Sequence, residues 1–552
     1  MKYISTLTIL LLLLVTACTK QGDIQVITNV NGYTLAGDSL LNFSTLAIQN
    51  GKVLDIGGDE ISDKYSAVTK VDGKGQTMLP GLIDAHGHVM GLGFQELQVN
   101  VAGITTLEGT LEKIKEYAEE NPDLEWIQGR GWNQTHWEEN EFPTAADLDK
   151  VVPDRPVWLS RVDGHAGWAN TLAMKKAGIS RDTPDTQGGK IIRDSKGDAA
   201  GVFVDAAQWH INSIIPEATA TERALAFEKS LEQMRKMGIT SAHDAGVSVE
   251  AWELFKSVAD KGKLTTRIYA MIGGAGKTFD ELSKNGPINS YANDMLSLRS
   301  VKIYSDGALG SRGAAMLEPY SDDPGNVGLL FSDQDEMNEM VLKVTEKGFQ
   351  ANVHAIGDRA NREVLNAFEY SRDKLGEKGL RNRVEHTQIV SLEDIPRFKE
   401  LNIIASMQPT HATSDMNMAE DRVGPDRIKG SYAWKSFLNQ GTVVAAGSDF
   451  PVEHSNPFYG LYSAVTRMDH EGNPPGGWYP NEALTREEAL RAFTVDAAYA
   501  AHQENVLGTL EKGKWADFIL IDKDYFKAPA IEIWDTKVLE TWVAGKKVYS
   551  SN

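Results

Sequence analysis

The 552-residue chain has a single cysteine, Cys18. An intramolecular disulfide is therefore impossible, and zinc sites built from paired cysteines are excluded as well. Basic residues are also few: 56 Lys and Arg stand against 77 Asp and Glu, which gives a net charge of −21. A surface of this sign repels phosphate backbones, so we expect no nucleic-acid partner. The same charge argues against a polybasic membrane patch.

The N-terminal segment 1–17 has the pattern of an export signal. Lys2 gives a positive start, and the apolar run from Leu7 to Val15 is short for a bilayer span. The sequence Val-Thr-Ala-Cys that ends at Cys18 resembles a bacterial lipoprotein signal, in which the cysteine is lipidated and becomes the first mature residue. We expect residues 18–25 to tether the protein to the bacterial cell envelope, facing the periplasm or the exterior. An ordinary signal peptide or a buried core cysteine is the alternative.

Eight short apolar runs, each ending in polar residues, are spaced along the chain. Helical stretches such as 224–236, 333–347 and 362–375 separate most of them. Strands that alternate with helices pair in parallel, so eight units predict an α/β fold with a (β/α)8 barrel and an active site at the C-terminal strand ends. An open doubly wound sheet is the alternative, although no GxGxxG sequence supports it. The runs are 76–84, 238–244, 265–272, 301–306, 350–354, 383–387, 403–408 and 443–449.

Other segments do not fit a plain barrel. Residues 45–48 and 52–56 flank Asn50-Gly51, a strong hairpin signal, and 518–521 and 538–548 are predicted strands near the C-terminus. Roughly 150 residues separate the first two barrel strands, far more than an ordinary βα connection needs. We therefore expect an insertion subdomain, 126–210, that covers the active site. The barrel itself is assigned to 80–125 and 211–505.

His86 and His88 follow the first run in the sequence Asp-Ala-His-Gly-His. Residues two apart share a face of an extended strand, so both imidazoles can bind one cation. Alone, the pair fits two solvated histidines equally well. Further potential ligands stand at or near the ends of four later runs. Imidazole and carboxylate groups suit divalent zinc and neighbouring transition metals, so we expect one or two divalent ions, Zn²⁺ before others. The later candidate ligands are Lys302, His354, His386 and Asp449.

Lys302 belongs in such a cluster only if its charge is changed. An ammonium group beside divalent cations is electrostatically unfavourable. Reaction of the amine with carbon dioxide gives an anionic carbamate, whose two oxygens can bridge two metals. The alternative is a buried lysine paired with Asp306.

These residues, in this order, resemble the amidohydrolase superfamily, whose hallmark here is PGLIDAHGH at 80–88. The closer likeness is to amidohydrolase family 3, the branch containing N-substituted formamide deformylases. The resemblance implies a distorted (β/α)8 barrel of the metal-dependent hydrolase type, a small composite β-sandwich from 26–79 and 506–552, and an insertion over the site. The other segments that carry the resemblance are GRGWNQTHW (129–137), RVDGHAGWAN (161–170), VKIYSDGALGSR (301–312), HAIGDRA (354–360), EHTQ (385–388), AAGSDFPVEHSNPF (445–458) and GTLEKGKWADF (508–518).

The resemblance also implies a role for each ligand. His86, His88 and Asp449 bind the more buried metal, and His354 and His386 bind the second. Carboxylated Lys302 bridges the two. Asp449 accepts the proton of the metal-activated water and passes it to the leaving nitrogen. No GxSxG sequence is present, so a serine nucleophile is not expected. The predicted function is hydrolysis of an amide or formamide-like C–N bond, other than a peptide bond, in a small molecule.

The sequence also suggests catalytic residues and residues that support or line the site. Asp449, His386 and His165 are the predicted catalytic residues, with His165 reaching from the insertion to the substrate or acting as a hydrogen-bonded loop histidine. Glu385 is expected to orient a neighbouring ligand. Arg312 is a candidate for holding a substrate carboxylate. Three tryptophans are expected to form either the core of the insertion or a wall of the substrate pocket: Trp132, Trp137 and Trp168.

Two other functions remain open at this point. One is a mononuclear deaminase-type hydrolase on the same barrel, against which Lys302 argues. The other is a non-catalytic lipoprotein that binds a small molecule, against which Asp449 argues because a binding protein needs no general base. The sequence specifies neither the substrate nor the oligomeric state, and a homo-oligomer is among the assemblies it allows.

Overall fold

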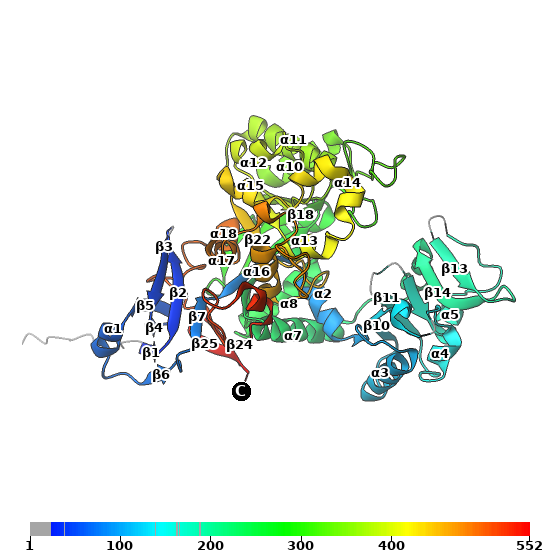
Figure 1. Cartoon of the computed structure of the whole chain (residues 1–552), viewed down its shortest axis with the longest axis horizontal. Coiled ribbons are helices and arrows are strands. Elements are labelled where there is room, and N and C mark those ends of the chain that lie inside the picture. Colours follow the sequence, from blue (N-terminus) through cyan, green and yellow to red (C-terminus); the bar gives the residue numbers. More distant parts are fainter. Residues whose placement is uncertain are drawn as a thin grey trace, which may run out of the picture.

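The computed structural model describes residues 24–37, 39–138, 140–161, 164, 166–186 and 189–551. The predicted signal segment 1–17 and Cys18 lie outside this range, so the lipid anchor stays a prediction. In the described part of the chain, no helix combines the length and the hydropathy of a membrane span. Figure 1 shows a β-rich domain at one end of the molecule, a barrel in the middle and a separate lobe at the other end.

Eight parallel strands form a nearly closed barrel, which confirms the predicted fold class. The first and last strands approach each other where the Asp449 N–H donates to the His86 carbonyl oxygen at 2.7 Å. Gly447 allows this approach, because a Cβ atom there would lie 2.4 Å from the His86 nitrogen. In chain order the strands are β8 (Leu82–Gly87), β15 (Ile239–Val247), β16 (Arg267–Gly273), β18 (Leu296–Tyr304), β19 (Gln350–Ala355), β20 (Arg383–His386), β21 (Ile404–Met407) and β22 (Val444–Ala446).

Helices cover the barrel and begin where the sequence provides caps. Thr485 and Glu488 form a capping box at the start of α17 (Arg486–Ala492). Boxes of the same kind, at Thr219 and Asp333, start α7 and α10. The helices of the barrel region are α2 (Val89–Glu96), α7 (Ala220–Lys236), α8 (Val249–Asp260), α9 (Lys277–Leu282), α10 (Gln334–Glu346), α11 (Asp358–Leu375), α12 (Ile395–Glu400), α13 (Pro409–Asp415), α14 (Ala419–Arg427), α15 (Trp434–Asn439), α16 (Pro457–Thr466), α17 (Arg486–Ala492) and α18 (Val495–Ala500).

The predicted first run, 76–84, is two strands in two different sheets. β7 (Thr77–Pro80) pairs antiparallel with β23 (Phe518–Ile521), whereas β8 pairs in parallel with β15. Pro80 has no N–H to continue a ladder. Gly81 lies so close to β15 that a Cβ atom would meet the Thr240 hydroxyl at 2.2 Å. The chain therefore changes sheet at Pro80-Gly81.

Strands from both ends of the chain form a two-sheet domain. β23 lies between β7 and β24, so N-terminal and C-terminal strands share one sheet. Both sheets contribute to one core that includes Leu46, Phe518 and Trp542. The predicted hairpin joins β4 to β5 through Asn50 and Gly51, both with positive φ. One sheet contains β1 (Ile24–Thr28), β4 (Thr45–Gln49), β5 (Lys52–Gly57) and β6 (Lys70–Asp72); the other contains β2 (Asn31–Ala36), β3 (Ser39–Phe43), β7, β23, β24 (Val538–Val543) and β25 (Lys546–Ser550).

A buried ion pair ties this domain to the barrel. Arg267, at the start of β16, donates through Nε and Nη2 to the two oxygens of Asp517, at 2.6 and 3.0 Å. Asp517→Ala would leave a buried guanidinium without its partner, so we expect the free energy of unfolding in urea to fall by about 3–5 kcal/mol. As a control, the double variant Arg267→Met, Asp517→Leu should recover most of this loss. A single variant as stable as the wild type would contradict the expectation.

The insertion is a lobe with its own sheet and core. Its strand order is β13-β14-β12-β11-β10-β9, so β9 (Val99–Asn100), expected in the barrel segment 80–125, pairs in this lobe instead. The indole rings of Trp132, Trp137 and Trp168 are buried together with centroids 6.0–6.4 Å apart, which places them in the lobe's core. The remaining elements are α3 (Leu107–Glu120), β10 (Ile127–Trp132), α4 (Ala145–Asp149), β11 (Val157–Arg161), β12 (Ala166–Ala169), α5 (Thr171–Lys176), β13 (Gly189–Arg193), β14 (Ala199–Asp205) and α6 (Trp209–Asn212).

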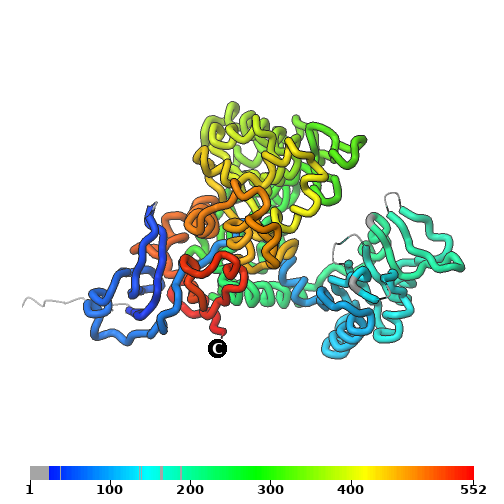
Figure 2. Tube along the Cα trace, in the orientation of Figure 1, coloured from blue at the N-terminus to red at the C-terminus, as the bar shows by residue number. Residues whose placement is uncertain are grey.

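The chain reaches the lobe after α2 and returns to the barrel at α7, as Figure 2 shows. Arg130 of β10 touches the barrel rim, where its Nη1 donates to the Pro451 carbonyl oxygen at 3.4 Å. This contact lies two residues after Asp449. Coverage of the active site by the lobe stays a prediction.

Candidate metal centre

The predicted ligands lie at one end of the barrel. His86 is the residue before the last in β8, and Lys302 is near the end of β18. His354 and His386 lie at the ends of β19 and β20. Asp449 follows β22. Because the strands are parallel, their C-terminal ends meet on one face, where barrel enzymes have their active sites.

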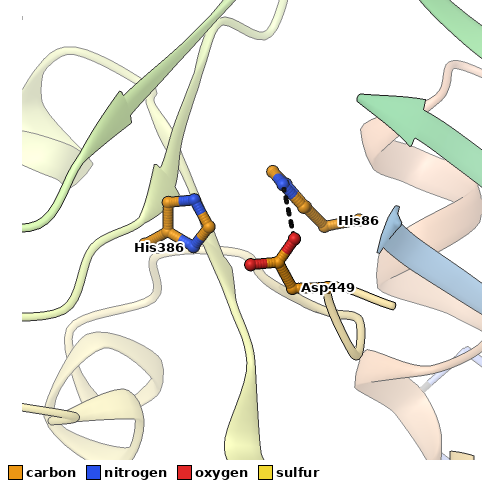
Figure 3. Close-up of side chains that lie close together, drawn as sticks. All are labelled: His86, His386 and Asp449. Atoms are coloured by element: carbon orange, nitrogen blue, oxygen red, sulfur yellow. Dashed lines mark ion pairs between the residues drawn. The ribbon is translucent and has the colours of Figure 1, made fainter. Parts of the chain in front are cut away.

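Figure 3 shows the centre of this group, with His86 and Asp449 facing the ring of His386. One ligand atom from each of these three buried residues lies within 4.8 Å of the others. His88 adds its Nε2 at 3.1 Å from Oδ1 of Asp449, and Lys302 places its Nζ 3.1 Å from Nε2 of His86. The structure therefore brings these predicted ligands together.

The sixth predicted ligand, His354, borders the same group. Its ring centroid lies 4.5 Å from that of His386. It is buried, and its Nε2 is 3.4 Å from Oδ1 of Asp306. The Asp306 carboxylate also accepts the backbone N–H groups of Ile356 and Gly357, so it caps the turn after β19. The alternative pairing of Lys302 with Asp306 is not what the structure shows, since Lys302 Nζ lies at His86 instead.

Charge states in the cluster suit a cation. Burial, assisted by Lys302, lowers the pKa of His86 to about 4. Burial and the neighbouring His354 lower the pKa of His386 well below its ordinary value. Both imidazoles are therefore neutral, which is the form that binds metal. Burial also lowers the pKa of Lys302 to about 8, which makes its amine more readily neutral than a solvated lysine.

Asp449 provides the test of whether a metal fits. Burial raises the pKa of its carboxyl, but hydrogen bonds from His411 and His88 outweigh this and hold it well below its usual range. Oδ1 is buried, and it faces two ring nitrogens, Nε2 of His88 at 3.1 Å and Nε2 of His86 at 3.6 Å. A buried anionic oxygen among neutral imidazole nitrogens is a donor set suited to Zn²⁺ or a similar ion.

The backbone at two of these positions is unusual. His386 has φ 76° and Asp449 has φ 62°, both in the left-handed region that residues with a Cβ atom rarely adopt. Such conformations cost of order 1–3 kcal/mol each and cluster at functional sites. Both residues lie where a barrel strand ends at the candidate metal centre, so the strain is located at this site.

Polar residues behind the cluster fix the rings. Oε2 of Glu385 contacts Nδ1 of His86 in a short hydrogen bond, so Glu385 orients a neighbouring ligand as predicted. Arg383 holds Glu385 in turn, with Nε 2.7 Å from Oε1. Nδ1 of His386 lies 2.8 Å from Oε1 of Gln408. With Nδ1 engaged, each imidazole has its Nε2 left to face a metal.

Sequence reasoning missed His411 and Glu453. Nε2 of His411 is 3.3 Å from Oδ2 of Asp449, and its Nδ1 is 3.2 Å from Oε1 of Glu453. The signal was available, because His411 directly follows the seventh apolar run in Gln-Pro-Thr-His and Glu453 is four residues after Asp449. Burial alone would lower the pKa of His411, but its two carboxylate partners raise that pKa well above the ordinary value.

Arg312 has an ion-pair partner outside the cluster. Arg312 pairs with Asp322, Nη2 to Oδ2 at 2.9 Å, so this guanidinium already has a carboxylate partner within the chain, and its binding of a substrate carboxylate stays a prediction. His165 lies outside the described residues, and its role stays a prediction. His243, in the middle of β15, is buried and its Nδ1 lies 3.0 Å from Nη1 of Arg383.

This chain is similar to known proteins over nearly their whole length. A putative amidohydrolase of Bacillus subtilis (strain 168), YtcJ, is 32% identical over 519 residues, covering 92% of this chain and 96% of that protein. The N-substituted formamide deformylase of Arthrobacter pascens is 27% identical over 545 residues, covering 96% of this chain and 98% of that protein. The crystal structure of an uncharacterized metal-dependent hydrolase from Pyrococcus furiosus matches with a TM-score of 0.75 at 28% identity, covering 91% of this chain and 100% of that one.

The family comparison agrees with the motifs and with the site. The model of the amidohydrolase family matches residues 69–549, which include both barrel-closing strands and all six predicted ligands. The chain therefore belongs to the amidohydrolase family and is a metal-dependent hydrolase.

Proposed function

We propose that the protein hydrolyses an amide or formamide-like C–N bond in a small molecule, with Zn²⁺ as its metal. The observation that carries this proposal is the buried Oδ1 of Asp449, an anionic oxygen that faces Nε2 of His88 at 3.1 Å and Nε2 of His86 at 3.6 Å. A general base needs an anionic acceptor of this kind. The relative that is named as an N-substituted formamide deformylase supports the choice of bond.

In this proposal some residues of the site bind metal and Asp449 also transfers a proton. His86, His88 and Asp449 would hold one ion, His354 and His386 would hold a second, and a carboxylated Lys302 would be a further ligand. A cation bound there polarises a substrate carbonyl and lowers the pKa of water. Asp449 takes up a proton at Oδ1 and returns it to the nitrogen that leaves, so the amine departs uncharged. The carbamate forms when the Lys302 amine adds to carbon dioxide and releases one proton.

A substrate panel tests the proposal. The purified protein is incubated with N-formyl amines, N-acyl amines, dipeptides and amino-substituted heterocycles, and the release of formate or other carboxylate, amine and ammonia is measured. We expect carboxylate and amine in equal amounts from the N-formyl or N-acyl compounds. Ammonia released from a heterocycle would favour the deaminase alternative instead. Saturable binding of these compounds without turnover of any of them would favour the non-catalytic alternative.

A further inference from the structure

His411 lies between two carboxylates at the edge of the metal centre. Its Nε2 faces Oδ2 of Asp449 at 3.3 Å, and its Nδ1 faces Oε1 of Glu453 at 3.2 Å. The His411 side chain is only 14% exposed and that of Asp449 is 9% exposed, so little water competes for these contacts. Both ring nitrogens are therefore engaged, and the ring has one orientation.

The backbone of His411 is also fixed. It lies in the first turn of α13, which starts at Pro409, a residue whose φ suits the first helical position. The His411 N–H donates to the Gln408 carbonyl oxygen at 3.1 Å. Because the Gln408 side chain contacts His386, one short segment after β21 supports both a predicted metal ligand and His411.

Asp449 uses its two oxygens differently. Oδ2 faces His411, whereas Oδ1 faces Nε2 of His88 at 3.1 Å and Nε2 of His86 at 3.6 Å. A carboxylate turns about its Cβ–Cγ bond, so a hydrogen bond to one oxygen also determines where the other points. Without that hydrogen bond, the carboxylate can rotate, and Oδ1 then no longer faces the two histidines.

The geometry points to His411 as the residue that positions Asp449, with Glu453 holding the imidazole so that Nε2 faces Oδ2. This inference rests on the proposed function, in which Oδ1 of Asp449 accepts the proton. His411 touches neither substrate nor reacting atoms in this role. It acts through Asp449, by keeping Oδ1 directed at the position between the imidazoles. Partners of this kind are typically worth about 10–100-fold in metal affinity or activity.

Two amide substitutions separate positioning from general structural support. In His411→Gln the side-chain amide nitrogen takes the place of Nε2 and keeps a donor towards Asp449. In His411→Asn the amide nitrogen takes the place of Nδ1 and keeps only the side towards Glu453. We expect kcat to fall about 10–100-fold in His411→Asn and less than about fivefold in His411→Gln, with KM little changed in both. Equal losses in the two variants, or a larger loss in His411→Gln, would overturn the inference.

A second measurement does not depend on turnover. Zinc affinity is determined for each apo-protein by competition with a chromophoric chelator, and we expect weaker binding by about tenfold or more in His411→Asn but not in His411→Gln. The matched control is His454→Asn, at an exposed histidine next to Glu453, which should behave as the wild type. If the wild type cleaves no amide but the two variants still differ in zinc affinity, the proposed function fails and the positioning of Asp449 stands. Equal zinc affinities in both variants would contradict the positioning.

Discussion

Removal of the metal is expected to abolish turnover. The cluster of His86, His386 and Asp449 places neutral imidazoles beside an anionic carboxylate, which is a set of ligand atoms suited to a divalent cation. Lewis-acid assistance is worth several kcal/mol, so its loss lowers the rate by about 10³-fold or more. The measurement is the rate of amide cleavage before and after dialysis against a strong chelator.

Reconstitution provides the control for this experiment. Zinc added back in the presence of bicarbonate should restore the rate, and elemental analysis should then find two ions per chain. One ion per chain would favour the mononuclear alternative and remove the need for a bridging Lys302. Full activity in protein shown by the same analysis to be free of metal would contradict the assignment of the centre. Unfolding curves recorded before and after dialysis separate loss of metal from loss of fold.

The sequence predicted the barrel, and it predicted which side chains gather at one end of it, because both follow from local patterns. His86, Lys302, His354 and His386 each sit at or near the end of an apolar run, and parallel pairing brings such ends to one face whatever the details of packing. The hairpin at Asn50-Gly51 and the cap at Thr485 are similarly local. In these cases a few neighbouring residues determine the structure.

What the sequence did not predict depends on contacts between distant residues. The first run crosses two sheets because β7 finds its partner in β23, more than 400 residues later. The lobe begins at β9, whose two residues carry too little pattern to be recognised alone. The ion pair between Arg312 and Asp322 was not predicted, because no local pattern shows that the two side chains meet. His411 was overlooked because its significance lies in the direction of one nitrogen towards Asp449, which no spacing encodes.

The second large effect is expected for Asp449→Asn. The amide has the shape of the carboxylate, so the packing around a residue that is 7% exposed should change little. It cannot take up a proton at ordinary pH, and loss of a general base typically lowers the rate by 10²–10⁴-fold. We therefore expect kcat per bound metal to fall by about 10³-fold, measured alongside zinc content so that lost affinity is not mistaken for lost chemistry.

A neighbouring carboxylate gives the matched control for this variant. Asp415 in α13 is largely buried and accepts hydrogen bonds from Gln388 Nε2 and the Tyr432 hydroxyl at 2.9 and 2.7 Å, neither of which is a predicted metal ligand. Asp415→Asn makes the same chemical change without touching Asp449, so its kcat should stay within about threefold of the wild type. If Asp449→Asn retained comparable activity at full zinc occupancy, the proton would have to be carried by another group. The base would then have to be sought among the histidines, with His411 as the first to be replaced.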